Sequence, residues 1–402
     1  MKILSVHKYY YDRDGASHYQ LEVNRLLQLR GHEVIPFAMQ SENNLKTPWS
    51  KFFVSPVQTE RVTYGFQALR TVLRMFYSFE ARDKMRRLIM ETKPDVAHIH
   101  NIYGQISPSI LDALAEAGVP TVMSVHDYHL ISPNYMLWKD GKNVDMRRVG
   151  ILRATLSRFH KRSFLASFAQ ASAFKFHQWL RFYDRNIARF VCPSDFTAQK
   201  LISAGYPKKN VRVIPHFIDT TNVKPVFDGD GSVLFVGRFV EEKGVRFILD
   251  LAKEMSETAF VLVGDGPLGE EVRACAKELG NVEVTGWLGR EALAQTYARA
   301  SVVIVPSLWQ EVFGLVALEG MAYGKPVLVS DQGGLPEVVE DGVTGLVLPA
   351  GDLGDWEDAL VQLLSNEKKR RAMGESARKR VENFYTPSRH LEALDRVFQE
   401  VR

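Results

Sequence analysis

The stretch PSLWQEVFGLVALEGMAYGKPVLVSDQGG, residues 306–334, decides how this chain folds. It follows the apolar run 302–305, which predicts a buried strand. Residues 314–323 are then predicted to form a helix, which Gly324 and Pro326 end. A second apolar run comes directly after the proline and predicts another strand. This order of strand, helix and strand predicts a parallel α/β domain, with the helix beginning at a cleft above the sheet.

Two carboxylates and a glycine turn give this unit its chemistry. The first N–H groups of the helix have no partner within it, and together with the helix dipole they suit a phosphate or diphosphate. Gly314, between Phe313 and Leu315, lets such a ligand approach the backbone. Glu319 on the helix is placed to bind a ribose, and Glu311 in the loop to bind the hydroxyls of a sugar. Either glutamate alone would more simply be a solvated surface charge, but their combination favours a ligand site.

The stretch closely resembles the retaining glycosyltransferases of glycosyltransferase family 4. Glu311 and Glu319 match the family's two glutamates with seven residues between them, and Phe313-Gly314 matches the pair that follows the first glutamate. Residues 333–337, Gly-Gly-Leu-Pro-Glu, match the motif that follows the next strand. The resemblance is specific over roughly 233–349 and looser in the N-terminal half.

This resemblance implies the GT-B fold, an α/β architecture of two Rossmann-like doubly wound domains that face each other across a cleft. An N-terminal domain, 1–216, would bind the acceptor, and a C-terminal domain, 217–385, would bind the nucleotide-sugar. A final helix at about 386–402 would pack back on the first domain.

Composition is consistent with two soluble domains. The chain has 402 residues, of which 46% are hydrophobic and 24% charged. No apolar run approaches the roughly 20 residues that span a bilayer, and the N-terminus lacks the pattern of a signal peptide. Cys192 and Cys275 are expected to be buried thiols, not a disulfide or a metal site. These features predict a cytoplasmic protein.

The N-terminal half opens as a doubly wound domain should. Residues 2–6 predict a strand, and Gly15-Ala16 stands where the following turn meets a helix. Small residues there let a helix N-terminus face a diphosphate, although a simple tight turn would need no more. The resembling family usually has two glycines at this place, so Gly15-Ala16 is a departure that still leaves the backbone accessible.

His126 follows the predicted strand 121–125, and ligands of parallel sheets bind at the carboxyl ends of strands. A lone histidine is more often structural, but this position favours a functional one. In the resembling family a histidine here contacts the donor sugar and helps to stabilise positive charge at the anomeric carbon.

The strand 232–236 ends in two cations, Arg238 and Lys243, which suit a nucleotide diphosphate and the charge that builds on it as the sugar leaves. Residues 264–269 spell a G-x-G-x-x-G pattern. It follows the second strand of its domain, not the first, and contains Pro267, so it does not indicate a nicotinamide cofactor. Gly266 in this turn is expected to approach the nucleotide.

Basic residues and aromatic or aliphatic ones alternate in two segments. The first, 66–92, predicts one basic amphipathic helix, which suits an anionic membrane surface or an ordinary solvated face equally well. The second, 132–189, has few acids, and much of its aromatic content is expected to be helix core. Nucleic acid fits such a composition in general, but an acceptor or a membrane leaflet is the leading interpretation, and we expect no nucleic-acid partner.

The sequence thus predicts a retaining, hexosyltransferase-like enzyme of bacterial polysaccharide or glycolipid type. It would move a sugar from a nucleotide-diphosphate sugar to a glycan, lipid-linked or small-molecule acceptor, with no cofactor and no metal. Front-face attack, with the leaving phosphate as base, comes from the resemblance. The alternatives are a GT-B phosphorylase, a sugar-nucleotide epimerase, a nicotinamide dehydrogenase, or a membrane-peripheral scaffold that binds a nucleotide-sugar without turnover.

Overall fold

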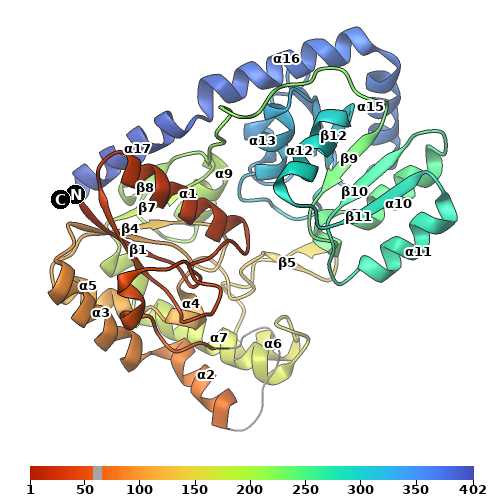
Figure 1. The fold of residues 1–402 in the computed structure, drawn as a ribbon. Coiled ribbons are helices and arrows are strands. Elements are labelled where there is room, and N and C mark those ends of the chain that lie inside the picture. Colours follow the sequence, from red (N-terminus) through yellow and green to blue (C-terminus); the bar gives the residue numbers. More distant parts are fainter. Residues whose placement is uncertain (58–65) are drawn as a thin grey trace.

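A computed structural model describes residues 1–57 and 66–402, with side chains for all of these except 66–69. Within the described residues the chain forms two parallel six-stranded sheets, one in each half, and a small two-stranded hairpin (Figure 1). The expected GT-B arrangement of two doubly wound α/β domains is confirmed. Among these residues no helix has both the length and the apolar character needed to cross a membrane.

The N-terminal sheet has the strand order β2-β1-β3-β4-β7-β8. Its strands are β1 (Lys2–Val6), β2 (Glu33–Phe37), β3 (Val96–Ile99), β4 (Thr121–Ser124), β7 (Arg189–Cys192) and β8 (Val211–Val213). The helices of this half are α1 (Gly15–Leu29), α2 (Phe66–Phe76), α3 (Phe79–Thr92), α4 (Tyr103–Ile106), α5 (Ser109–Glu116), α6 (Ile151–Leu156), α7 (Phe164–Trp179), α8 (Phe182–Asn186) and α9 (Asp195–Ser203). Short 3₁₀ turns, η1 (Pro48–Phe52) and η2 (Lys208–Asn210), and the hairpin β5 (Trp138–Lys139) and β6 (Lys142–Asn143) complete it.

The C-terminal sheet has the order β11-β10-β9-β12-β13-β14. Its strands are β9 (Val233–Val236), β10 (Phe260–Val263), β11 (Val282–Gly286), β12 (Val302–Val305), β13 (Val327–Ser330) and β14 (Gly345–Leu348). Its helical elements are η3 (Glu241–Lys243), α10 (Val245–Glu254), α11 (Gly269–Leu279), α12 (Arg290–Arg299), α13 (Leu315–Ala322), α14 (Leu335–Val338), α15 (Leu353–Ser365) and α16 (Glu367–Phe384). The central strands are buried along their length, as near-continuous Val, Ile and Leu runs require of a parallel sheet covered on both faces.

Each sheet reverses its strand order once, and this point positions the site. In the C-terminal sheet the reversal lies between β9 and β12, and in the N-terminal sheet between β1 and β3. Loops that leave adjacent strands at such a point diverge to opposite faces, so a crevice opens at the carboxyl edge. The loop of Arg238 and Lys243 leaves β9, and the loop of Glu311 leaves β12. The loops of these three residues therefore leave the sheet at neighbouring strand ends.

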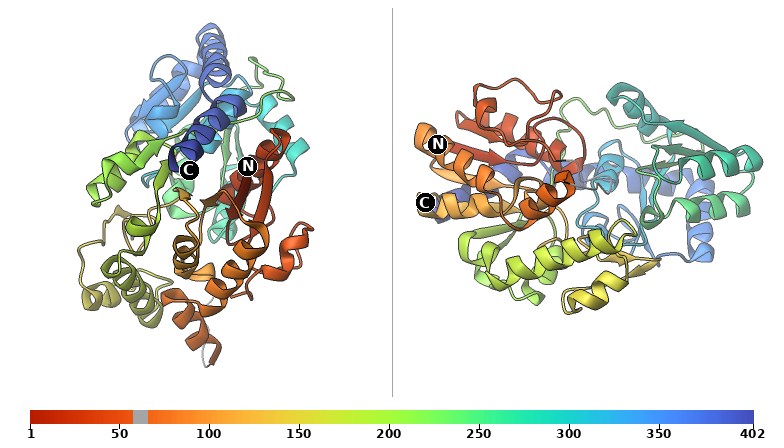
Figure 2. Two further views of the ribbon diagram at one scale, coloured as in Figure 1. Left: turned by 90° about the vertical axis from the view of Figure 1, so that its left-hand side faces the viewer. Right: turned by 90° about the horizontal axis from the view of Figure 1, so that it is seen from below.

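The last helix, α17 (Pro387–Val401), crosses back to the N-terminal domain (Figures 1 and 2). Its His390 Nε2 lies 2.9 Å from the Tyr19 hydroxyl on α1, and Asp395 pairs with Arg30 at 2.9 Å. Leu394 is fully buried between them. The crossing predicted for about 386–402 is present, whereas the boundary between 216 and 217 stays a prediction.

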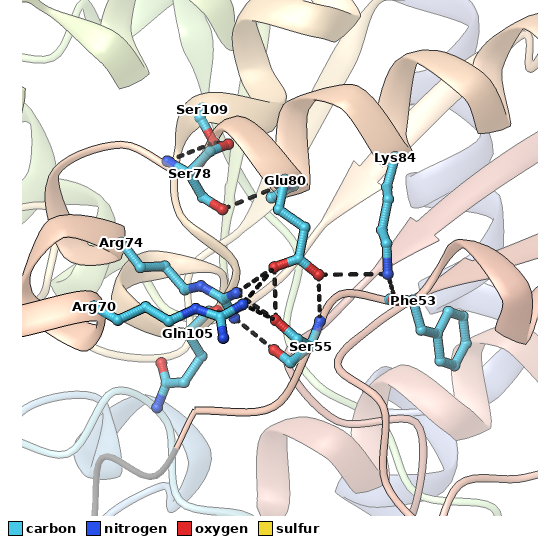
Figure 3. A network of polar contacts seen from close by, with 10 residues as sticks. Phe53, Ser55, Arg70, Arg74, Ser78, Glu80, Lys84, Gln105 and Ser109 are labelled. Carbon is cyan, nitrogen blue, oxygen red and sulfur yellow. Dashed lines mark hydrogen bonds and ion pairs between the residues drawn. The ribbon is translucent and has the colours of Figure 1, made fainter. Parts of the chain in front are cut away.

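The single helix predicted over 66–92 is wrong, because the chain breaks between α2 and α3. Ser78 stands at the break, and its hydroxyl accepts a hydrogen bond from the Ala81 N–H, which caps α3. The buried Arg74 guanidinium then bonds Glu80 and Ser55, and Lys84 bonds the same carboxylate, so these cations do not form a basic outer face (Figure 3). The side chain of Leu69, an apolar residue of this segment, lies outside the described residues.

Candidate functional site

An ion pair joins the loops that leave β9 and β12. Lys243, at the end of η3, donates to Glu311 Oε1 at 2.5 Å, and the Ser307 hydroxyl donates to the same oxygen at 2.6 Å. Only 8% of the Glu311 side chain is exposed, against 32% for Lys243. The carboxylate is thus held in one position, and the ammonium remains partly exposed to solvent.

The glycines after β13 explain why Glu311 is so fixed. The Gly334 N–H donates to the Glu311 carbonyl at 2.8 Å. Gly333 has φ +67°, and a Cβ there would lie 2.1 Å from the same carbonyl oxygen. The motif at 333–337 therefore serves as a close-fitting support for the loop of Glu311, a reason that the sequence analysis did not find.

The N-terminus of α13 is open. Gly314 precedes it with φ +125°, and among the described residues no side chain caps its first N–H groups. A Cβ at Gly314 would meet Leu335 Cδ2 at 2.6 Å, which explains a glycine here. Phe313 is buried, and Leu315 begins the helix. The arrangement can bind an anion through backbone donors.

Glu319 lies one turn further along α13. Its Oε2 accepts a hydrogen bond from the buried Tyr297 hydroxyl at 2.7 Å, and Tyr297 stacks on Tyr323. Burial raises the pKa of Glu319 above its ordinary value, and the bond from Tyr297 opposes that rise. The carboxylate is oriented by a partner and remains able to accept further hydrogen bonds.

Arg238 belongs to an open pocket on the other side of β9. This pocket, of about 690 Å³, is lined by Arg238, Asp265, Gly266, Pro267, Glu270, Arg273 and Trp287. The turn of Gly266 was predicted to approach a nucleotide. It borders the same cavity as Arg238, the residue predicted to bind the diphosphate. Trp287 is 65% exposed and presents a flat apolar wall to it.

His126 belongs to a cluster of histidines at the edge of the N-terminal sheet. Its Nε2 lies 2.9 Å from His100 Nδ1, and its ring stacks on His216 with centroids 5.8 Å apart. Burial, and secondarily the charge of neighbouring histidines, lowers the pKa of His126 well below the ordinary value. The imidazole is therefore neutral at physiological pH. His100 follows β3, and no signal in the sequence indicated that it contacts His126.

The turn after His126 touches the C-terminal domain. The Tyr128 hydroxyl donates to the Gln310 carbonyl at 2.8 Å, and the His216 ring lies 5.2 Å from that of Phe313. The strand-end loops of the two domains thus contact each other directly.

Gly15-Ala16 faces α13 across the same interface. A Cβ at Gly15 would lie 3.5 Å from Leu315 Cδ1, so the starts of α1 and α13 are adjacent. The carboxylate of Asp14 caps α1 by accepting from the Ser17 N–H, and it lies 4.0 Å from the Lys8 ammonium. An anion at this helix start would meet that carboxylate as well as the open N–H groups of Gly15 and Ala16.

Glu337 has a role that no sequence signal indicated. Its two carboxylate oxygens accept from the Asp195 and Phe196 N–H groups at 2.7 Å each, at the start of α9 in the other domain. A carboxylate at a helix N-terminus is favoured by the dipole. Glu337 therefore connects the two domains and does not belong to the ligand site.

Family models match both halves of the chain. One described as "Glycosyltransferase Family 4" matches residues 13–222, and one described as "Glycosyl transferases group 1" matches residues 218–380. The first covers more than half of the chain, and the chain belongs to glycosyltransferase family 4. Among curated proteins it is 36% identical to the O-antigen chain mannosyltransferase C of Escherichia coli over 169 residues, 41% of this chain and 45% of that protein. The chain spans about half the length of the curated relatives it matches.

Solved structures show the same fold. Sucrose-phosphate synthase from Thermosynechococcus elongatus superposes with a TM-score of 0.71 at 18% identity, over 100% of this chain and 99% of that one. HepE of Anabaena, solved in complex with UDP-glucose, superposes with a TM-score of 0.68 at 16% identity over 99% of each chain. At these identities the likeness concerns the fold.

Proposed function

We propose that the protein is a retaining glycosyltransferase that moves a sugar from a nucleotide-diphosphate sugar to an acceptor. The observation that carries the proposal is the Lys243–Glu311 ion pair between the loops after β9 and β12, together with the uncapped start of α13 and the pocket lined by Arg238. Family membership and the UDP-glucose bound by the structurally similar HepE support a nucleotide-sugar donor.

In the proposed donor complex, each group has one task. Arg238, Lys243 and the first N–H groups of α13 bind the diphosphate, with Gly15 and Ala16 facing it across the cleft. Glu319, oriented by Tyr297, binds the ribose diol, and Glu311 binds hydroxyls of the sugar. The base lies in the pocket beside Gly266. Two cations and backbone donors meet the negative charge, so we propose that no divalent ion is required.

The proposed reaction is a front-face displacement. The acceptor hydroxyl oxygen bonds to the anomeric carbon on the face from which the diphosphate leaves, and the C–O bond to the diphosphate breaks. The acceptor proton passes to the leaving phosphate oxygen, so atoms and charge balance without an enzymic base. Neutral His126 adds no positive charge beside the developing cation and can stabilise it through a ring nitrogen lone pair. The acceptor is a glycan or lipid-linked sugar on the N-terminal domain, and the protein works at the cytoplasmic face of a membrane.

Binding of diphosphates tests the donor site first. The unfolding midpoint should rise with one of UDP, GDP or ADP, and Arg238→Ala should abolish that rise. Arg246→Ala, on α10 and paired with Glu271 outside the pocket, is the matched control and should keep it. A rise with NAD alone would overturn the proposal in favour of a dehydrogenase.

Turnover then separates the enzyme classes. A transferase releases nucleotide diphosphate from the chosen donor only when an acceptor is present, and chelation with EDTA leaves that rate unchanged. Interconversion of the donor without acceptor would indicate an epimerase, and a requirement for inorganic phosphate would indicate a phosphorylase. The anomeric coupling constant of the product, measured by NMR, tests retention.

A further inference from the structure

One segment of the N-terminal domain combines exposed apolar side chains with a run of positive charge. Between residues 146 and 183 there is no Asp or Glu, and there are eight Lys or Arg residues. Six of the eighteen large apolar side chains that the structure describes as exposed fall within 28 residues of this segment, namely Leu152, Leu156, Phe164, Leu165, Phe168 and Trp179. Single exposed apolar residues are ordinary on a protein surface, but such a concentration indicates an interaction site.

These side chains belong to two helices that pack on each other. Met146, Ala154 and Ala171 form a small core between α6 and α7 and leave the opposite sides free. Leu165 and Phe168 are 68% and 53% exposed on one side of α7, and Leu152 and Leu156 are 74% and 63% exposed one turn apart on α6. The two helices lie next to each other in the lower part of Figure 1, and Figure 2 gives two further views of them. We call the surface made by these four residues with Arg153 and Arg162 the α6–α7 face.

The arginines here differ from those of the neighbouring helices. In the described part of the chain, Arg82 and Arg86 of α3 bond Glu116, and Arg74 of α2 bonds Glu80 (Figure 3). By contrast, Arg153 and Arg162 are exposed, and neither forms an ion pair with any described carboxylate. The positive charge of the α6–α7 face is therefore available to an anionic partner.

The connection between α6 and α7 extends toward the proposed donor site. His160, in the connection between α6 and α7, has its ring 6.3 Å from that of Tyr135. Tyr135 in turn lies near enough to Arg238 for the guanidinium to act on the pKa of the phenol, against the larger effect of burial. The connection between α6 and α7 is thus linked through Tyr135 to the surroundings of Arg238.

We propose that the α6–α7 face docks on an anionic lipid bilayer. The four leucine and phenylalanine side chains enter the boundary of the acyl chains, and the arginines contact lipid phosphates. Leucine has no aromatic ring on which a nucleic-acid base could stack, so the leucines favour lipid over a single-stranded polynucleotide. The inference rests on the proposed function only in one respect, that docking would present a lipid-linked acceptor to the crevice.

Vesicle cosedimentation of the full chain tests the proposal without any substrate. Binding to phosphatidylcholine vesicles that contain about 30% phosphatidylglycerol should exceed binding to pure phosphatidylcholine about tenfold, and salt should weaken it. The double variant Arg153→Gln/Arg162→Gln should lose about tenfold in affinity for the anionic vesicles. Leu165→Ser/Phe168→Ser should lose at least as much.

Matched variants on other exposed helices control for general effects. Lys253→Gln/Lys277→Gln removes two exposed cations from α10 and α11, and Leu29→Ser/Val361→Ser removes two exposed apolar residues, and both should bind vesicles as wild type does. Equal binding to neutral and anionic vesicles, no binding, or equal losses in test and control pairs would overturn the proposal. Binding of a labelled oligonucleotide that both test pairs abolish, without vesicle binding, would identify a polynucleotide partner instead. Because donor binding is measured separately with soluble nucleotides, failure of docking is distinct from failure of the proposed function.

Discussion

Removal of the Lys243 ammonium should cost both stability and turnover, and the two losses have different causes. Glu311 has 8% of its side chain exposed and would be left with the Ser307 hydroxyl as its partner in the described structure. Breaking a fully buried ion pair costs about 3–5 kcal/mol, and an exposed one at most about 1 kcal/mol. Since Lys243 is 32% exposed, Lys243→Met should lower the free energy of unfolding by about 2 kcal/mol.

Urea unfolding of a double-mutant cycle measures this loss. Glu311→Gln in the Lys243→Met background removes the unpaired charge, so the double variant should be more stable than the sum of the single losses by about 1 kcal/mol. Arg238→Met is the matched control, because Arg238 lies at the same strand end, is exposed and forms no described ion pair. It should change stability by less than about 0.5 kcal/mol.

Turnover should not follow stability in this series. Both Lys243→Met and Arg238→Met remove a cation from the proposed diphosphate site, and each should lower kcat about 10²–10³-fold, the usual effect of losing one charge-stabilising donor. The double variant Lys243→Met/Glu311→Gln should be as inactive as Lys243→Met, although it regains stability. Additive stability losses, or equal stability of the Lys243 and Arg238 variants, would refute the inference that this pair is effectively buried.

Three further predictions follow from single side chains. Gly333→Ala should lower stability by several kcal/mol more than Gly342→Ala and lower turnover, because both glycines have φ near +70° but only at Gly333 would a Cβ strike the Glu311 backbone; equal urea midpoints would show that this support is not required. The ratio of kcat/KM between wild type and His126→Asn should stay constant between about pH 5.5 and 8, because burial keeps the imidazole neutral throughout; a change of several-fold near pH 6.5 would contradict it. Burial lowers the pKa of Lys325 to about 8 from 10.5, so between these values the unfolded chain holds a proton that the native state has lost. The stability of wild type relative to Lys325→Met should therefore rise with pH across this window, by up to about 3 kcal/mol, and a flat or falling difference in urea titrations would exclude the shift.

Much of the C-terminal half could be predicted because local rules decide it. The apolar runs before Arg238 and Glu311 are short and β-branched, Gly314 and Gly324 bracket a helix, and parallel strands end at one edge. These facts place Arg238, Lys243, Glu311 and Glu319 in segments that follow strand ends at one edge of the sheet, without knowledge of any side-chain contact. The break between α2 and α3 was missed because the apolar periodicity continues through Ser78, whose capping bond competes with the helix only in the folded chain.

The sequence by itself determined the class of fold, the positions of its main strands along the chain and the edge at which polar residues gather, since periodicity and turn residues act over a few positions. Only the tertiary structure decided which of these residues pair. Lys243 and Glu311, Glu337 and the start of α9, and His126 and His100 lie far apart along the chain. Such contacts depend on how strands align and how two domains meet, and the partner of a buried charge is set by whichever group packing brings within hydrogen-bond distance.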